Sequence, residues 1–88
     1  WKNAQQEEVD FVLREGTKTR QLIQVCTNLE AASTRVREVR SLLKASMELL
    51  CDDLLVLTGS YEATEKAEWF GIKREVRFTP IWKWLAAN

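Results

Sequence analysis

The sequence contains no histidine, one proline, three glycines and two cysteines among its 88 residues. Without histidine, catalytic triads of the usual histidine-based kind are excluded, and two cysteines alone make a poor zinc site. No apolar run approaches about 18 residues and no signal-peptide pattern is present, so nothing indicates a membrane or secretion. A glycine-rich phosphate-binding loop is also missing, so these residues predict no nucleotide hydrolysis.

An excess of charge of one sign is missing too, since thirteen basic side chains balance thirteen acidic ones. Any attraction to nucleic acid must therefore come from local patches. The 45% hydrophobic and 30% charged fractions are typical of one small globular domain, here residues 1–88. Cys26 and Cys51 lie among apolar neighbours, which predicts buried, reduced thiols in a cytoplasmic protein, with a disulfide as the alternative. Because the chain opens at Trp1 rather than Met, we expect a piece of a longer polypeptide.

The first half of the chain predicts a β-hairpin. Residues 8–14, EVDFVLR, alternate apolar and polar side chains, EGTK at 15–18 suits a tight turn, and RQLIQVCT at 20–27 predicts a second strand. With Thr17 at the tip, one face is continuously apolar and carries Val9, Phe11, Ile23 and Val25. The other face pairs Val12 with Leu22, Asp10 with Gln24, and Glu8 with Cys26. A slip of one residue would mix the faces, so the pattern selects this register.

The second half predicts a helix, a buried strand and another hairpin. After a loop at 28–33, with Ser33 or Thr34 as the helix cap, apolar side chains recur at helical spacing to about residue 50. DLLVLT at 53–58 is apolar on both faces, which predicts a parallel pairing with the earlier strand around a crossover helix. Gly71 predicts the turn of a second hairpin. Pro80 suits the first turn of a short closing helix that places Ile81, Trp84 and Leu85 on one side.

Several blocks in this order resemble a known family: EVDFV, LIQVC, RE, LLKAS, LLVLT and PIWKWL. From about Glu8 to Leu85 the chain is similar to the C-terminal domain of archaeal and bacterial P-loop ATPases of the AAA type, which is itself similar to restriction endonucleases and Holliday junction resolvases. The resemblance implies an α/β fold with a restriction-endonuclease-like mixed sheet, made of an antiparallel hairpin, a crossover helix, a parallel strand, a C-terminal hairpin and a short helix. It also implies that ATPase activity lies in a missing N-terminal domain, which would be a partner of this one.

The same resemblance implies a metal site. In that nuclease fold an aspartate on the first hairpin strand and an acidic-x-lysine triplet on the second hold a divalent ion. Asp10 matches the aspartate, but Gln24, Val25 and Cys26 occupy the triplet, so an amide replaces the carboxylate and a thiol replaces the lysine. We therefore expect a degenerate site in which Asp10, Gln24 and Glu8 hold Mg²⁺ or Mn²⁺.

The missing lysine matters for catalysis, because removing one such electrostatic group typically slows a reaction by about 100- to 1000-fold. A cation from the predicted helix would have to take its place. We assign this role to Lys44, with Arg40 or Arg37 as alternatives, so the predicted catalytic residues are Asp10, Gln24 and Lys44.

Simpler interpretations of the same residues stay open. Asp10 can be a satisfied edge-strand carboxylate, and Gln24 a hydrogen-bonded structural amide. The basic side chains can form a solvated helix face instead of a phosphate-binding strip: Arg35, Arg37, Arg40 and Lys44. The tryptophans are more typical of packing than of base stacking: Trp69, Trp82 and Trp84.

Two functions remain. The first is a DNA-binding module of a prokaryotic ATPase with residual metal-dependent phosphodiesterase activity. The second is a non-catalytic interaction or dimerisation module, in which Trp82–Leu85 and exposed strand edges contact a partner or a second copy. We expect no membrane partner in either case.

Overall fold

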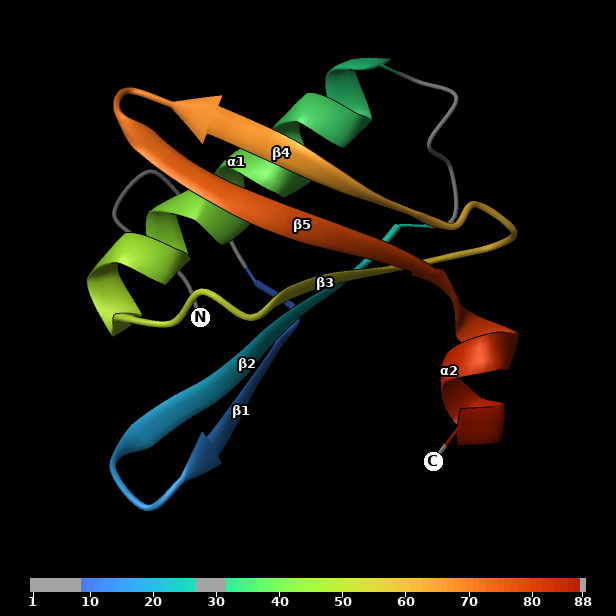
Figure 1. Ribbon diagram of the computed structural model, residues 1–88, viewed down its shortest axis with the longest axis horizontal. Coiled ribbons are helices and arrows are strands. Elements are labelled where there is room, and N and C mark those ends of the chain that lie inside the picture. Colours follow the sequence, from blue (N-terminus) through green and yellow to red (C-terminus); the bar gives the residue numbers. More distant parts are fainter. Residues whose placement is uncertain (1–8, 27–31, 88) are drawn as a thin grey trace.

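A computed structural model describes the fold over residues 9–26 and 32–87, with side chains described for 9–26 and 36–87. Its elements are β1 (Phe11–Glu15), β2 (Lys18–Val25), α1 (Ala32–Leu49), β3 (Leu54–Thr58), β4 (Ala63–Trp69), β5 (Ile72–Pro80) and α2 (Ile81–Ala87). The strands form one sheet in the order β1-β2-β3-β5-β4 (Figure 1). The predicted α/β class with a mixed sheet is confirmed, and the restriction-endonuclease-like fold stays a prediction.

The centre of the sheet is parallel and its edges are antiparallel. β3 pairs in parallel with β2 on one side and with β5 on the other, and every residue of Leu54–Thr58 is buried. This is the strand predicted to be apolar on both faces, and its neighbours explain why: a central parallel strand has covered faces on both sides. α1 connects β2 to β3, as predicted. It begins at Ala32, so Ser33 and Thr34 lie within its first turn instead of capping it.

The predicted register of the first hairpin is confirmed at the start of β1, since Phe11 lies opposite Ile23 and Val12 opposite Leu22. It is wrong near the turn, where an irregularity after Leu13 shifts the pairing by one residue and sets Glu15 opposite Lys18. The chain reverses at Gly16, whose φ of +63° suits a glycine. The prediction is wrong at Val9, which was expected on the face of Phe11. β1 begins at Phe11, and the chain bends at Asp10 before it. Val9 therefore turns to the opposite face and joins the core beneath α1.

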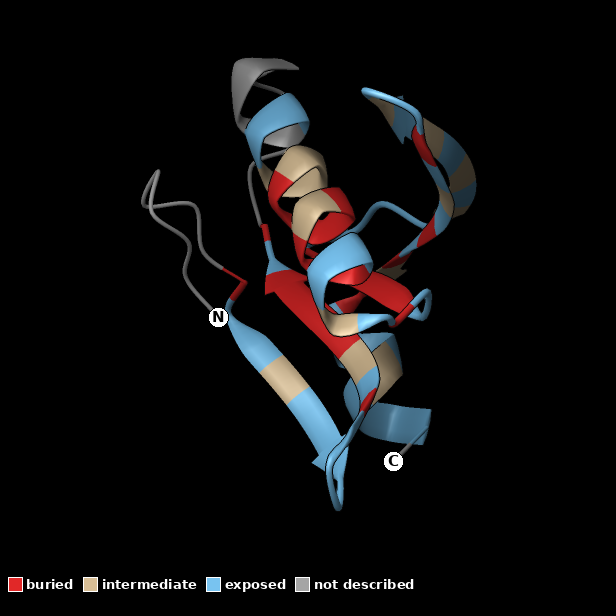
Figure 2. Ribbon diagram, turned by 90° about the vertical axis from the view of Figure 1, so that its left-hand side faces the viewer, coloured by how far each residue is buried: buried red, intermediate tan, exposed pale blue. Residues whose placement is uncertain are grey.

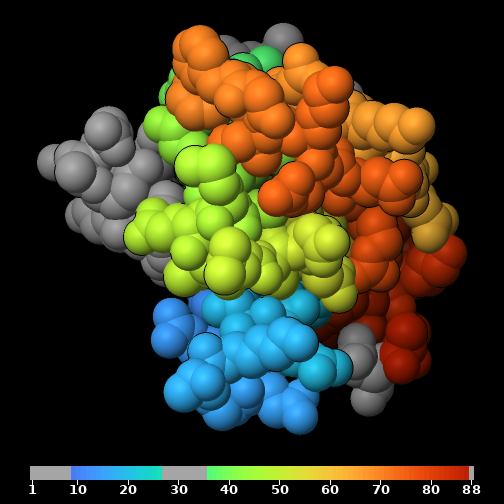
Figure 3. Space-filling model, turned by 60° about the vertical axis from the view of Figure 1, so that its left-hand side comes forward, coloured from blue at the N-terminus to red at the C-terminus, as the bar shows by residue number. Residues whose placement is uncertain are grey.

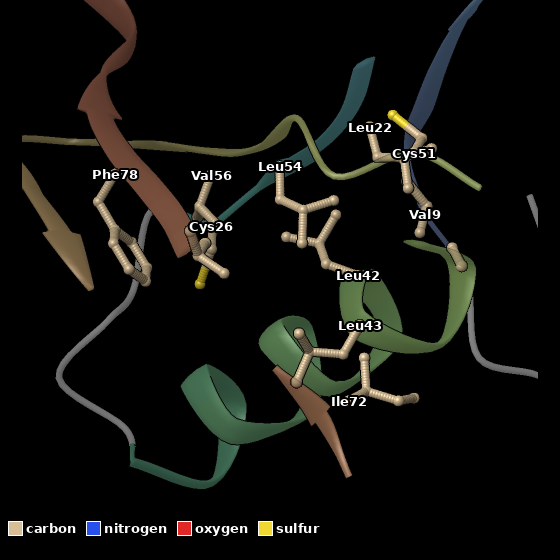
Figure 4. Close-up of a cluster of buried hydrophobic side chains, with 12 residues drawn as sticks. Val9, Leu22, Cys26, Leu42, Leu43, Cys51, Leu54, Val56, Ile72 and Phe78 are labelled. Atoms are coloured by element: carbon tan, nitrogen blue, oxygen red, sulfur yellow. The ribbon is translucent and has the colours of Figure 1, made fainter. Parts of the chain in front are cut away.

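The core consists of two clusters on opposite faces of the sheet. The larger cluster lies between the sheet and α1, where Leu42 and Leu43 meet Leu54, Val56 and Phe78 (Figure 4). The smaller cluster contains Ile23, Leu55 and Leu57, and Trp84 of α2 packs against it. Alternate residues of β2 and β3 thus enter different clusters, as the two-residue period of a strand requires.

The face that carries α2 is covered unevenly. Phe11 and Leu13 of β1 are 55% and 44% exposed, although the sequence predicts a continuous apolar face that includes Phe11. Most of β1 has the pale blue of exposed residues in Figure 2. Ile81 and Leu85 are also exposed, so the predicted apolar side of α2 packs mainly through Trp84. Pro80 is the last residue of β5 and precedes α2 instead of lying in its first turn. Neither described helix is long and apolar enough to cross a membrane.

Candidate functional site

Asp10 and Gln24, the first two predicted site residues, lie next to each other. The backbone N–H of Asp10 donates to the side-chain oxygen of Gln24 at 2.7 Å. The Asp10 carboxylate in turn accepts the backbone N–H of Val25 at 2.8 Å. These two bonds take the place of strand pairing just before β1 begins. They hold the bend at Asp10 against β2.

Gln24 also reaches α1. Its side-chain nitrogen donates to the Glu38 carboxylate at 2.7 Å, and the residue is only 1% exposed. The amide oxygen faces an N–H donor and the amide nitrogen faces a carboxylate, so both ends are matched to their partners. Gln24 therefore connects the segment before β1 to the helix, which is the structural role that the sequence left open.

The Glu38 carboxyl lies in a partly buried position beside another acidic residue. Burial raises the pKa of its carboxyl above the ordinary value of 4.5, and the nearby negative charge of Asp10 raises it further. Arg37 lowers it, with its guanidinium 3.7 Å from the other carboxylate oxygen. Two carboxylates thus lie close enough to repel each other, with one exposed arginine beside them.

The predicted metal ligands can be tested against this geometry. Mg²⁺ and Mn²⁺ need oxygen atoms that point into a shared space, whereas the Gln24 oxygen points at the N–H of Asp10. Glu8 lies outside the described residues. Within the described part of the chain, no group of three or more Asp, Glu, Cys or His side chains could hold a metal ion. Gln24 does not fit as a ligand in this arrangement, and the metal site stays a prediction.

Lys44, the predicted catalytic cation, does not join Asp10 and Gln24. Its ammonium group lies over the ring of Trp69, 4.4 Å from the ring centre, and the Arg40 guanidinium lies over the same ring at 5.8 Å. Trp69 belongs to β4, whereas Asp10 precedes β1, and these strands form opposite edges of the described sheet. Of the three cations considered, Arg37 is the one beside Glu38.

Cys26, which replaces the lysine of the resemblance, is buried in the core beneath α1 near Val56 (Figure 4). Cys51 is buried in the same cluster, and the two cysteines form no disulfide. The prediction of buried, reduced thiols is confirmed. A position sealed by aliphatic side chains has no room for a solvated ammonium group.

A second group of candidate side chains lies on the other flank of α1. The hairpin of β4 and β5 turns through Phe70 and Gly71, whose φ angles are +47° and +82°. Phe70 is 86% exposed, and its ring meets Trp69 edge to face at 4.5 Å. Arg74 ties the hairpin to α1 by donating to the Ser46 hydroxyl at 2.9 Å. Side chains of the orange hairpin lie against the green side chains of α1 in Figure 3.

Sequence reasoning missed Glu38 and Phe70. Glu38 falls in the first part of the predicted helix, but no sequence pattern links it to Gln24 fourteen residues earlier. Phe70 had a usable signal, because it precedes Gly71 in a hairpin where asparagine is the favoured residue.

Comparison with models of protein families, with curated proteins and with solved structures gives no match for this chain.

Proposed function

We propose that this chain is a restriction-endonuclease-like accessory domain of a larger prokaryotic ATPase, and that it binds nucleic acid. The observation that carries the proposal is the stacking of two cations on Trp69 beside an exposed Phe70. Basic groups attract the phosphate backbone, and aromatic rings offer surfaces for bases. We name the surface formed by Arg40, Lys44, Trp69 and Phe70 the β4 flank of α1.

Basic side chains recur along one side of α1 although the chain has no net charge overall. Arg37, Arg40 and Lys44 follow one another at intervals of three and four residues, which places them on one side of a helix. Two carboxylates of β4, Glu65 and Glu68, line the same surface as Arg40. Glu68 forms an ion pair with Lys73, and Glu65 accepts a hydrogen bond from the hydroxyl of Tyr61. The proposal therefore depends on the row of basic side chains along the helix, which would contact phosphates.

The proposal concerns binding, since the geometry around Asp10 does not favour phosphodiester cleavage. We name the group Asp10, Gln24 and Glu38 the β2 flank of α1. Here the amide is used inside the fold, and the lysine position is occupied by the buried Cys26. Residual activity with Mg²⁺ or Mn²⁺ would have to use the carboxylates of Asp10 and Glu38 with Arg37 as the nearby cation.

Binding is tested by fluorescence anisotropy with a labelled oligonucleotide and increasing NaCl. We expect affinity to fall as salt rises, because counterions are released from the phosphates. Arg40→Gln combined with Lys44→Gln should weaken binding by roughly tenfold at 0.1 M salt and reduce the salt slope. The matched control is Arg14→Gln with Lys18→Gln, which removes two exposed cations from the first hairpin. Equal losses in both double variants, or no binding by the unaltered chain, would contradict the proposal.

A second function is favoured by one observation on the opposite face. Phe11, Leu13 and Val25 are exposed beside the cluster that Trp84 covers, so an apolar strip extends from the smaller core to the β1 edge. A non-catalytic interaction module, with a second copy of the chain as the predicted partner, would bury this strip.

The two functions predict different results for the same substitutions. If the second is correct, light scattering should show a concentration-dependent dimer that Leu13→Lys abolishes and the Arg40 and Lys44 substitutions leave intact. A monomer at all accessible concentrations would eliminate self-association. Since the substitutions lie on different faces of the sheet, each function can be tested without disturbing the other.

A further inference from the structure

Phe70 occupies a position that costs the fold stability. It is the first residue of a two-residue turn in which both φ angles are positive, +47° at Phe70 and +82° at Gly71. Turns of this kind favour asparagine followed by glycine, because an ordinary side chain is crowded in the left-handed region. The glycine is present, whereas the asparagine position holds a large aromatic residue.

Packing does not account for this choice. Phe70 is 86% exposed, so its ring adds little to the core. Its neighbour Trp69 is the residue that packs against the core beneath α1. A strained conformation that supports a solvent-exposed apolar ring points to a role outside the fold.

The surroundings of Phe70 hold its ring in a defined place. Trp69 contacts it edge to face, with 4.5 Å between ring centres and 70° between ring planes. Lys44 and Arg40 lie over the ring of Trp69, and Arg74 bonds both Ser46 of α1 and the carbonyl of Lys73. The hairpin tip is therefore fastened to the helix that carries the cations.

We infer that Phe70 stacks on a base of a single-stranded nucleic acid while Arg40 and Lys44 contact the neighbouring phosphates. This inference rests on the proposed function and names its substrate class. Stacking requires an uncovered base face, and in a duplex both faces of each base are covered by neighbours. An exposed ring beside cations is the arrangement by which single strands are bound without sequence preference.

The experiment measures the binding of a labelled twelve-residue oligothymidylate, an abasic strand of equal length, a duplex and an oligouridylate. The unaltered chain should bind oligothymidylate roughly tenfold or more tightly than the abasic strand, and more tightly than the duplex. Comparable affinity for oligouridylate would extend the substrate to RNA, and weaker affinity would restrict it to DNA. Both results support stacking on a single strand.

The decisive variant is Phe70→Asn, which places the favoured residue in the turn and so preserves the hairpin. It should bind oligothymidylate as weakly as the unaltered chain binds the abasic strand. Phe70→Tyr keeps an aromatic ring and should retain affinity. Leu50→Gly is the matched control, since Leu50 is another exposed apolar residue with a positive φ, and it should leave affinity unchanged.

Three outcomes would overturn the inference. If Phe70→Asn binds normally while the Arg40 and Lys44 variants bind weakly, stacking is excluded and the proposed function stands. If no nucleic acid binds, both fall together. If vesicles containing phosphatidylserine bind in a Phe70-dependent way and oligonucleotides do not, the hairpin tip is a membrane contact.

Discussion

The two flanks of α1 use similar kinds of residue in opposite ways. On the β2 flank, the buried Gln24 accepts a hydrogen bond from the backbone N–H of Asp10 and donates one to the carboxylate of Glu38. On the β4 flank, cations stack on Trp69 while Phe70 extends into solvent. The flank that was predicted to hold a metal ion uses its buried amide for bonds within the fold. The flank without a sequence motif exposes the ring of Phe70 next to cations that lie over Trp69.

The difference shows that polar residues within an apolar pattern can serve the fold as well as a ligand. Gln24 was predicted as a site residue because the resemblance places it at the carboxylate position of the acidic-x-lysine triplet. In the structure the same amide satisfies an N–H group and a carboxylate at the junction of β2, α1 and the bend at Asp10. Its neighbours therefore decide its role, and those neighbours come from segments distant in sequence.

The largest expected effect comes from restoring the lysine of the nuclease resemblance. Cys26→Lys would place an ammonium group at a position that is 5% exposed and surrounded by the core beneath α1. Without a buried partner the charge should lower the free energy of unfolding by about 3 kcal/mol or more. Urea denaturation followed by circular dichroism measures the loss.

The control for Cys26→Lys is Cys26→Val, which keeps an apolar side chain of similar size and should cost less than about 1.5 kcal/mol. If the lysine variant is as stable as the valine variant and cleaves DNA with Mn²⁺, position 26 opens onto the β2 flank. The two flanks would then no longer differ, because position 26 would be open to solvent in the same way as Phe70.

A smaller loss is expected when the amide at the centre of the β2 flank is removed. Gln24→Leu leaves the N–H of Asp10 and the carboxylate of Glu38 without their partner, which should destabilise the fold by about 2 kcal/mol. Gln21→Leu is the matched control, since Gln21 makes a longer bond of 3.2 Å to Asp53 at an exposed position. We expect that control to change stability by less than about 0.5 kcal/mol. If Gln24→Leu and Gln21→Leu lose similar stability in urea denaturation, the hydrogen bonds of Gln24 stabilise the fold no more than an exposed bond does.

The third prediction concerns pH. Burial and Asp10 raise the folded-state pKa of Glu38 above its unfolded value of 4.5, so the folded state binds more protons between these two values. Stability contributed by protonated Glu38 is complete below pH 4.5 and is lost as pH rises through the folded-state pKa. Glu38→Gln keeps an oxygen that can accept from Gln24 and removes the charge. The variant should therefore gain stability relative to the unaltered chain between pH 4 and pH 7.

Urea titrations at several pH values measure this difference between the two proteins. Glu48→Gln, an exposed substitution on the same helix, provides the control and should show no comparable trend. If the unaltered chain instead becomes more stable relative to Glu38→Gln as pH rises, the attraction of the Glu38 carboxylate to Arg37 outweighs the cost of burying its charge. The ion pair of Glu38 with Arg37 would then stabilise the β2 flank, and the Glu38 carboxylate would be better solvated than its hydrogen bond with Gln24 suggests.

Local patterns predicted much of the fold. The two-sided apolar run of β3 indicated a central parallel strand, and the alternation of β1 and β2 selected the register that the structure shows as far as Leu13. Alternation separates the two faces of a strand, however, without showing which face will be covered. Phe11 and Leu13 lie together as predicted, yet α2 reaches the sheet elsewhere, at Ile23, Leu55 and Leu57.

The sites depend on contacts between distant segments, and local sequence patterns do not show which segments will meet. The pattern of α1 placed Lys44 off its apolar stripe, but the direction of the side chain depends on the strand order. Because β5 pairs with β3, β4 becomes an edge that lies beside α1, and Trp69 meets Lys44 there. The encounter of Gln24 with Glu38 has the same origin, since it requires α1 to pack across β2.

The smallest expected effect separates conformational strain from function on the β4 flank. Leu50 follows the last residue of α1 with a φ of +54°, and the N–H of Cys51 bonds the carbonyl of Ser46 at 3.0 Å, as in helix ends that favour glycine. Leu50→Gly should raise the free energy of unfolding by about 1 kcal/mol, and Phe70→Asn by a similar amount. Thermal denaturation measures both gains. The two variants should then differ in binding, with Leu50→Gly unchanged and Phe70→Asn weakened, because only the ring of Phe70 lies beside the cations. If Phe70→Asn is instead less stable than the unaltered chain, the ring supports the hairpin, and its exposure cannot be ascribed to a ligand.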